Sequence, residues 1–297
     1  MQPPSRSGTE LRYNSSAPPM GLEVRVPEPE VDRIFAGSIP QLYDQYMVPL
    51  IFEPYAEDLA ARVAARQPKS VLEIAAGTGV VTRRLASALQ ISTSLIATDL
   101  NQAMLDHAAS IGVSRPVEWR QADAAQLPFA DESFDVVVCQ FGAMFFPDKP
   151  GAFSEARRVL RAGGAFIFNV WDRIEHNEFA DMITAALGRM FPENPPRFMA
   201  RTPHGYCDQS LISRHLAQGG FTRSAEFTTL ASRSRARDAS VPAIAYCQGT
   251  PLRSEIEARA ASRLAEATDV AAAAIRSRFG SGTVDGKIQA LVVEVAR

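Results

Sequence analysis

A glycine-containing turn is the segment of this sequence best suited to approach a nucleotide. The run VLEIAAGTGV at residues 71–80 is a short apolar stretch that leads into two glycines and then into a helical pattern. Glycine lets the backbone turn tightly and approach a ligand with no side chain between them. Two glycines alone also occur in many structural turns, but their place between a predicted strand and a predicted helix favours a ligand-binding loop.

An acidic residue ends the next predicted strand. Asp99 follows Gly79 by 20 residues in the sequence. In a strand–turn–helix unit of this kind, such a carboxylate can accept hydrogen bonds from both ribose hydroxyls of an adenosine. It can also stabilise the N-terminus of the helix that follows. The two roles are compatible.

The residues around the turn distinguish between two classes of cofactor. A dinucleotide-binding turn needs a third glycine for close helix packing, and Thr82 occupies that position here. Glu73 also places a negative charge just before the turn, where a pyrophosphate would be repelled. S-adenosylmethionine (SAM) has no phosphate, and its ammonium and sulfonium groups are cationic. Both residues therefore favour SAM, and an NAD(P)-dependent oxidoreductase is the competing enzyme class.

The elements that must position this turn follow an alternating pattern. Runs such as residues 136–138 and 166–168 are apolar at consecutive positions, which indicates strands buried on both faces of a parallel sheet. With right-handed crossovers, the pattern predicts an α/β, doubly wound, Rossmann-like fold with a seven-stranded, mostly parallel sheet and helices on both faces. The predicted strands are 71–74, 95–98, 117–120, 134–139, 165–170, 225–230 and 288–295. The predicted helices among them are 81–88, 102–109 and 151–160.

Further segments flank or interrupt this pattern. Residues 1–30 are proline-rich and polar, which predicts a flexible leader before a domain of residues 31–297. A helix should then end at Pro49 and a second begin at Pro54. Apolar residues recur every three or four positions from Leu252 to Phe279, which predicts one long amphipathic helix that ends at Gly280. It belongs to a helical insertion at about 236–284, which we expect to cap an acceptor or to contact a second copy of the chain.

Four ordered blocks of this sequence resemble the class I SAM-dependent methyltransferases. The closest resemblance is to the branch that includes the ubiquinone/menaquinone biosynthesis methyltransferases. The blocks are VLEIAAGTGVVTRRLA at 71–86, TDLNQAML at 98–105, QADAAQLPFADESFDVVVCQFGAMFFPD at 121–148 and EARRVLRAGGAFIFNVWD at 155–172. The resemblance implies an enzyme that moves the methyl group of SAM to an O, N or C nucleophile of a small molecule and releases S-adenosylhomocysteine.

The resemblance also implies roles for the matching positions. Short stretches of the four blocks would bind different parts of SAM: its methionine end, its ribose, its adenine and the transferred methyl group. A helix that carries two tyrosines would lie over this site. The implied cofactor-binding residues are Tyr43, Tyr46, Glu73, Ala75, Gly77, Thr78, Gly79, Asp99, Leu100, Met104, Asp123, Ala124, Gln140 and Phe141. Core packing is the alternative role for Met104 and for the two tyrosines. Ala75 departs from the glycine common at its position.

The acceptor side carries less specific signals. Methyl transfer from a sulfonium requires alignment and exclusion of water, and it requires a base only if the nucleophile must lose a proton. His176, His204 and His215 follow the core blocks, and His176 is the candidate base because it is nearest in sequence to the exit of the fifth strand. An apolar acceptor pocket could be built from aromatic residues near the strand ends. The candidates are Phe145, Phe146, Trp171, Phe198 and Tyr206.

Composition excludes several partners and compartments. A net charge of −2 and a pI of about 6.1 give no electrostatic reason to expect nucleic-acid binding. No apolar run approaches the roughly 20 residues of a membrane span, and three scattered cysteines indicate no disulfide framework. We therefore expect a cytoplasmic protein with a small-molecule acceptor, no metal, and no integral membrane association. A homodimer is left open.

Two alternative functions share the same SAM signals. A phospholipid N-methyltransferase would carry similar blocks, although the sequence has no markedly basic amphipathic helix. A non-catalytic SAM-binding protein is the second alternative. The sequence leaves open the acceptor, the methylated atom, the presence of a base, the oligomeric state and whether Met20 is the true start.

Overall fold

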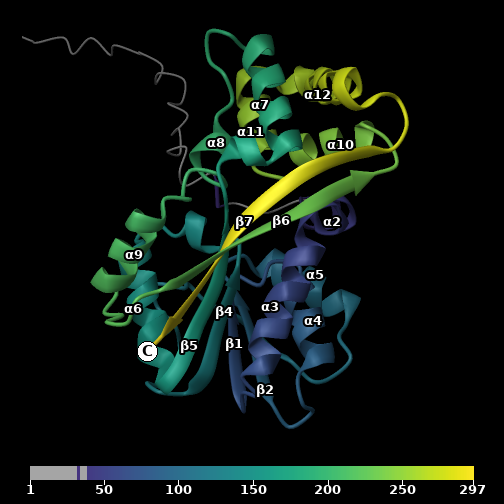
Figure 1. Ribbon diagram of the computed structural model, residues 1–297. Coiled ribbons are helices and arrows are strands. Elements are labelled where there is room, and N and C mark those ends of the chain that lie inside the picture. The colour runs from purple at the N-terminus through teal and green to yellow at the C-terminus, as the bar shows by residue number, and fades with distance from the viewer. Residues whose placement is uncertain (1–31, 34–38) are drawn as a thin grey trace, which may run out of the picture.

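The computed structural model describes residues 32–33 and 39–297, which form an open sheet covered by helices on both faces (Figure 1). The predicted leader of residues 1–30 lies outside the described residues. Above the carboxyl ends of the central strands lies a second layer of helices, which includes α7, α10, α11 and α12. No helix in the described part of the chain is long and apolar enough to cross a membrane.

The seven-stranded, mostly parallel sheet predicted from the sequence is confirmed. Its strand order is β3-β2-β1-β4-β5-β7-β6, and β7 runs antiparallel to both of its neighbours. The direction of winding reverses between β1 and β4, which is where ligands bind in open α/β sheets. The strands are β1 (Ser70–Ile74), β2 (Ser94–Asp99), β3 (Glu118–Gln121), β4 (Phe134–Gln140), β5 (Leu160–Trp171), β6 (Glu226–Ala236) and β7 (Val284–Ala296).

Alternate residues of the central strands enter two separate cores. Val137 and Phe166 belong to one buried cluster, whereas their neighbours Val136 and Ile167 belong to the other. All four side chains are at most 1% exposed. This explains why these strands have consecutive apolar residues: helices α3 (Glu53–Ala65) and α4 (Val80–Ala88) pack together on one face of the sheet, and α6 (Lys149–Val159) and α9 (Gln209–Gln218) pack together on the other.

The helix predicted to end at Pro49 continues through it, so that prediction is wrong. Helix α2 (Ile39–Leu42) leads into a π-helical segment, η1 (Tyr43–Phe52), which contains Pro49 and joins α3 directly. Proline breaks an α-helix because it lacks an N–H and its ring collides with the carbonyl four residues earlier. The wider π-helical turn changes that pairing, and π-helical turns are frequent at functional sites. Pro54 lies in the first turn of α3, as predicted.

The long helix predicted over residues 252–279 is two helices. Helix α11 (Leu252–Ala260) and helix α12 (Leu264–Phe279) are separated at Ala260, whose φ of −163° and ψ of 96° are extended, and by the short turn η4 (Ala261–Arg263). The break lets α11 pack on α8 (Phe198–Arg201) while α12 packs on α7 (Glu178–Met190) and α10 (Ser240–Gln248). Tertiary packing therefore overrides a continuous periodic pattern. Gly280 ends α12 as predicted.

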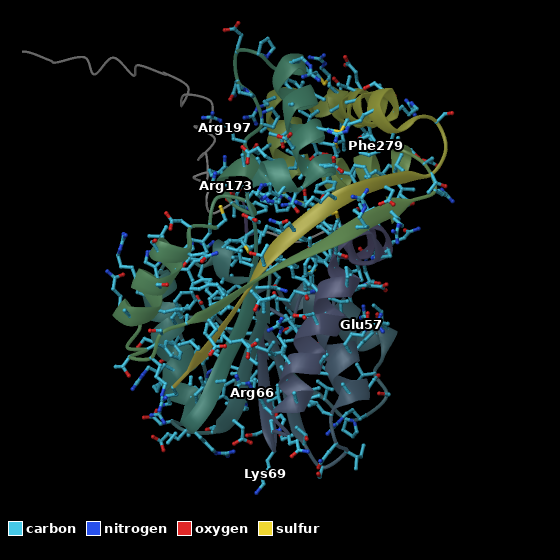
Figure 2. All side chains as sticks on the ribbon, in the orientation of Figure 1. Glu57, Arg66, Lys69, Arg173, Arg197 and Phe279 are labelled. Atoms are coloured by element: carbon cyan, nitrogen blue, oxygen red, sulfur yellow. The ribbon has the colours of Figure 1, made fainter. Side chains whose placement is uncertain are left out.

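The two ends of the sheet have different surroundings. Lys69 precedes β1 and lies at the open lower end, whereas Arg173 follows β5 and lies beneath the second layer of helices (Figure 2). Strands β6 and β7 continue to pair past the end of β5, from Ala231–Gln289 to Ala236–Val284, and reach into this layer. There Gly286 lies against the ring of Phe179 on α7, where an added Cβ would be 3.0 Å from the ring. The remaining helices are η2 (Ala143–Phe145), η3 (Ile174–His176) and α5 (Gln102–Ile111).

Candidate active site

A cavity, here called the donor cavity, opens at the carboxyl ends of β1, β2 and β4, with about 780 Å³ of empty space including the part open to solvent. It lies at the predicted switch point of the sheet. Ten of the residues implied to bind the cofactor line it together. They are Tyr43, Ala75, Gly77, Asp99, Leu100, Met104, Asp123, Ala124, Gln140 and Phe141.

The glycine turn is left-handed at three positions. Ala75 has a φ of 54°, Gly77 of 56° and Gly79 of 80°. A Cβ on Gly79 would also lie 3.0 Å from the ring of Trp119, so glycine is required there by both conformation and space. Ala75 keeps a conformation that usually favours glycine, and a Cβ on Gly142 would lie only 2.5 Å from the Cβ of Ala75. The alanine is therefore accommodated by a glycine on the facing loop.

Asp99 links the turn to the end of β2. Its carboxylate accepts hydrogen bonds from the backbone N–H of Gly77 at 2.8 Å and of Asn101 at 2.8 Å. Burial raises the pKa of Asp99, and these hydrogen bonds oppose the increase. The residue is 7% exposed and lines the donor cavity, so it holds the loop in place and presents a carboxylate at the cavity wall.

Four residues implied to bind the cofactor do not line the donor cavity: Tyr46, Glu73, Thr78 and Gly79. Glu73 is 1% exposed, and its carboxyl accepts a hydrogen bond from the hydroxyl of Thr82 at 2.6 Å. Burial raises the pKa of Glu73 to about 8, so the group is largely neutral at pH 7. Repulsion of a pyrophosphate by a charged Glu73 therefore finds no support in this geometry.

A second cavity, here called the acceptor chamber, lies beside the first, with about 500 Å³ of empty space including the part open to solvent. It shares three aromatic residues with the donor cavity: Tyr43, Phe141 and Phe145. The rings of Phe141 and Trp171 stack at 3.8 Å with an interplanar angle of 4°. Phe141 has a φ of 49°, and its N–H is held by the side-chain oxygen of Asn169 at 2.9 Å.

Aromatic and apolar side chains form most of the acceptor chamber, and none of the described residues that line it carries a carboxylate, ammonium or guanidinium group. Of the aromatic residues that the sequence offers for an acceptor pocket, Phe145, Trp171 and Phe198 line this cavity. Phe146 lines the donor cavity instead. Tyr206 lines neither cavity, because its hydroxyl lies 3.0 Å from the Nδ1 of His215 and its ring lies under Lys149.

The structure does not bring His176 to either cavity. Its Nδ1 lies 3.0 Å from the carboxylate of Asp172 and 3.1 Å from the amide of Gln289, and its side chain is 44% exposed. Nearness to β5 in the sequence did not decide its position, because the chain turns outward in η3. His204, which is 28 residues further along the sequence, lines the acceptor chamber instead.

Several lining residues were not predicted from the sequence. In the donor cavity, Thr98, Asn101 and Gly142 directly flank strand ends, so their positions carried a usable signal. Arg33 and Tyr246 come from segments with no nucleotide-binding pattern. The Nε of Arg33 is buried and has no hydrogen-bond partner among the described residues.

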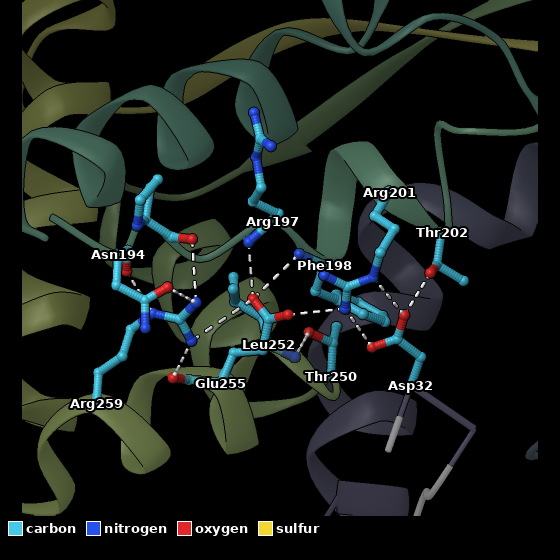
Figure 3. Close-up of polar contacts among 11 residues, drawn as sticks. Asp32, Asn194, Arg197, Phe198, Arg201, Thr202, Thr250, Leu252, Glu255 and Arg259 are labelled. Carbon is cyan, nitrogen blue, oxygen red and sulfur yellow. Dashed lines mark hydrogen bonds and ion pairs between the residues drawn. The ribbon is translucent and has the colours of Figure 1, made fainter. Parts of the chain in front are cut away.

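A charged cluster fixes the wall of the acceptor chamber (Figure 3). Glu255 of α11 accepts hydrogen bonds from the backbone N–H groups of Arg197 and Phe198, at 2.7 and 3.1 Å, and so caps the first turn of α8. Arg201 bridges Glu255 to Asp32 at 2.7 and 2.8 Å. Asp32 and Glu255 are 1% and 6% exposed. The cluster ties the segment before η1, α8 and α11 together around Phe198.

The donor cavity has the donors and acceptors that SAM requires. The side-chain oxygen of Gln140 is buried without a hydrogen-bond partner in the described part of the chain, which suits a cationic ammonium group. Asp99 offers a carboxylate, Met104 and Leu100 offer apolar surface, and left-handed Gly77 lets the backbone come close. The described residues include no group of three or more His, Cys, Asp or Glu side chains that could hold a metal ion.

Comparisons with known proteins agree with this geometry. Residues 72–168 match the family model described as "Methyltransferase domain". The chain is similar to the ubiquinone/menaquinone biosynthesis C-methyltransferase UbiE of Marinomonas sp. (27% identical over 172 residues; 54% of this chain and 68% of the relative) and to that of Ectopseudomonas mendocina (29% identical over 171 residues; 53% and 67%).

Solved structures share the fold. A putative methyltransferase from Bacillus halodurans superposes with a TM-score of 0.51 at 20% identity and covers 81% of this chain and 97% of its own. A Haemonchus contortus N-methyltransferase, in complex with phosphomonomethylethanolamine and S-adenosylhomocysteine, superposes with a TM-score of 0.55 at 17% identity; 89% of this chain and 59% of that chain are covered. Sequence blocks, fold and cavity agree: the chain carries a methyltransferase domain at residues 72–168, is similar in sequence to the UbiE C-methyltransferases, and is a SAM-dependent methyltransferase that acts on a small molecule.

Proposed function

We propose that the acceptor is a small, flat, uncharged molecule and that the methyl group is added to a ring carbon or to an oxygen attached to the ring. The observation that carries this proposal is the acceptor chamber, which is lined by aromatic side chains, carries no charged group among its described residues and shares a wall with the donor cavity. A cation or a phosphate would lose its hydration there without gaining a partner of opposite charge. A flat apolar ring loses little hydration energy there and gains contact area with the aromatic walls.

The names of the relatives support a carbon acceptor. UbiE of Marinomonas sp. is a C-methyltransferase of ubiquinone/menaquinone biosynthesis. Carbon methylation suits an acceptor held by stacking, because the reacting atom then belongs to the ring that the walls orient.

In this proposal the chain's own residues bind and align. Asp99 accepts from the ribose of SAM, Leu100 and Met104 flank the adenine, and Asp123 with Ala124 meets its edge. Gln140 accepts from the ammonium group, and Arg33 faces the carboxylate. When bound, SAM supplies a methyl group on a positively charged sulfur. Tyr43, Phe141 and Phe145 line both cavities; there they exclude water and bring the acceptor into line with that methyl group.

A matched pair of acceptors tests the proposal. Purified protein would be incubated with methyl-labelled SAM and either 1-naphthol or 4-hydroxynaphthalene-1-sulfonate, which differ by one charged group. We expect label in 1-naphthol or related neutral hydroxyarenes and none in the sulfonate. Labelling of phosphoethanolamine, with neutral arenes unlabelled, would overturn the proposal and support the phospholipid-type alternative. Label in none of these, despite SAM binding, would favour a non-catalytic binding protein.

The compartment and the assembly remain predictions. We infer a cytoplasmic enzyme that acts without nucleic acid, supported by three free thiols and the net charge of −2. Contact with a second copy is one of the two expectations for the insertion at about 236–284, but on the alanine-rich face of its last helix Ala267 and Ala271 are buried in the packing of α12 on α7 and α10. That face therefore offers no surface to a second copy. Sedimentation would measure the oligomeric state directly.

A further inference from the structure

We propose that His204 is the general base of this reaction and that it passes the acceptor's proton from the acceptor chamber to solvent. This inference rests on the proposed methylation of a neutral, flat acceptor. It replaces His176, which the sequence placed first. Three features of the molecule support this role: the position of the His204 ring, its hydrogen bond and the other polar groups of the chamber.

His204 lies between the acceptor chamber and the surface. It lines the chamber together with Trp171, whose ring centroid is 6.0 Å away. It also lines an open surface pocket formed by residues 173–176 and Ala200. The residue is only 7% exposed. Of the four histidines in the chain, His204 is the one that borders both spaces.

The hydrogen bond of His204 fixes which ring nitrogen carries the proton. Nδ1 lies 2.8 Å from the carbonyl oxygen of Asp172. A carbonyl oxygen only accepts, so Nδ1 must donate, and Nε2 of the neutral ring keeps its lone pair. The hydrogen bond of Nδ1 is the one that the His204 ring makes within the described part of the chain, so Nε2 is not engaged there. It is therefore available to accept a proton.

Other polar side chains of the acceptor chamber do not compete for this role. The amide of Asn177 donates to the carbonyl of Asp172 and accepts from the N–H of Gln289. Thr250 donates to the carbonyl of Tyr246 at 2.7 Å and accepts from the N–H of Leu252. Burial raises the pKa of the Tyr43 and Tyr246 hydroxyls, so both stay protonated. Nε2 of His204 is the basic nitrogen among the described lining residues.

The protons and electrons balance with a base of this strength. The bond between sulfur and the methyl carbon breaks with its electron pair left on sulfur, and a pair from the acceptor's oxygen or ring carbon forms the new bond. The cation that results on the acceptor is strongly acidic, so even a weak base takes its proton. Burial lowers the pKa of His204 to about 4, which keeps the ring neutral at pH 7. Nε2 accepts the proton and releases it to water in the surface pocket.

Nitrogen NMR tests the geometry without turnover. In protein labelled with ¹⁵N-histidine, four rings must be assigned. We expect His204 to be neutral with the proton on Nδ1, and its Nε2 resonance to move upfield when 1-naphthol is added with S-adenosylhomocysteine. His176 should not respond. A proton on Nε2 of His204, or an unchanged Nε2 resonance with 1-naphthol bound, would overturn the inference.

Kinetics separates a catalytic from a structural role. With a neutral arene that the wild type methylates, His204→Gln should lower kcat by about 100-fold or more, with the KM and the SAM affinity changed less than about threefold. Added imidazole should restore part of the activity of His204→Ala, and the matched variant His215→Gln, whose ring borders none of these spaces, should retain wild-type kcat. A kcat of His204→Gln within about threefold of wild type would refute the inference. Failure of the wild type to methylate any neutral arene would instead contradict the proposed function, and the tautomer measurement would still decide the position of the proton.

Discussion

The donor cavity and the acceptor chamber are adjacent, but they are built in different ways. The donor cavity is formed mainly by residues 74–147, at the ends of β1, β2 and β4, with backbone at Gly77 and Gly142 approaching the space directly. The chamber is formed by side chains from η1, the ends of β4 and β5, α8 and α10. Sheet pairing fixes the first cavity, whereas packing between distant helices fixes the second. A site fixed by sheet pairing suits SAM, which many enzymes share as the methyl donor. A site fixed by packing between helices suits an acceptor that is particular to one enzyme.

Because the two cavities are built from different parts of the chain, we expect variants of each to act on different constants. Changes at the donor cavity should alter SAM affinity and leave the acceptor KM unchanged, and changes at the chamber should do the reverse. The shared wall of Tyr43, Phe141 and Phe145 should affect both. Variants on either side test this separation, and the largest effect is expected on the chamber side.

Arg201→Leu should destabilise the chamber side of the molecule most. It would leave Asp32 and Glu255, at 1% and 6% exposed, without the cation that bridges them. Removing one partner of buried charges costs about 3–5 kcal/mol. Because the Arg201 side chain is itself 26% exposed, we expect the free energy of unfolding to fall by an amount near the lower end of this range. Urea unfolding measures the change. Arg235→Leu is the matched control, since Asp285 keeps its ion pair with Arg233. A similar loss in both variants would show that the cluster has no special role.

Asp99→Ala should weaken SAM binding by about 1–3 kcal/mol, the range for loss of a buried hydrogen-bonding group. Isothermal titration calorimetry with SAM measures the change. Asp106→Ala, on the exposed face of α5, serves as the control and should bind like the wild type. Unchanged affinity in Asp99→Ala would show that the ribose is held elsewhere.

Glu73→Gln should be more stable than the wild type at pH 8. Burial raises the pKa of Glu73 from 4.5 to about 8 in the folded chain, so the folded state holds a proton that the unfolded state releases. The contribution of Glu73 to the free energy of unfolding is therefore fully present below about pH 4.5 and decreases as the pH rises to 8. We expect the difference in free energy of unfolding between the variant and the wild type to increase by roughly 1–3 kcal/mol between pH 5 and pH 8 in favour of the variant. Denaturant unfolding at the two pH values measures it.

The same variant tests where Glu73 lies. Because Glu73 does not line the donor cavity, SAM affinity should stay within about twofold. A tenfold loss of affinity would show instead that Glu73 meets the methionine end, as the family resemblance implies.

Phe198→Leu should have the smallest effect and the most selective one. It replaces one apolar side chain in the wall of the chamber with a somewhat smaller one. The free energy of unfolding should therefore fall by less than about 1.5 kcal/mol. The KM for a neutral arene should rise a few-fold, with SAM affinity unchanged. Phe141→Leu, at the shared wall, should change both constants. An effect of Phe198→Leu on SAM affinity alone would contradict the separation of the two sites.

The donor cavity was largely predictable because its signals are local. A buried strand followed by a glycine turn, and an acid at the end of the next strand, are visible within 30 residues, and parallel pairing then brings the strand ends together. Ten of the fourteen implied residues line the cavity. The exceptions are instructive: Glu73 points away into the protein, where Thr82 binds it, because side chains alternate in direction along a strand.

The sequence by itself determined the fold class, the order of the strands along the chain, and the donor, since each depends on periodicity and on residues close together in the chain. Only the tertiary structure decided the π-helical passage through Pro49, the break at Ala260 and the choice of His204 over His176. Each of these depends on contacts between segments far apart in the sequence. His204 reaches the chamber because α8 is held by Glu255 of α11 and by Asp32, which are 51 and 172 residues away from it in the chain. No local pattern records such a contact.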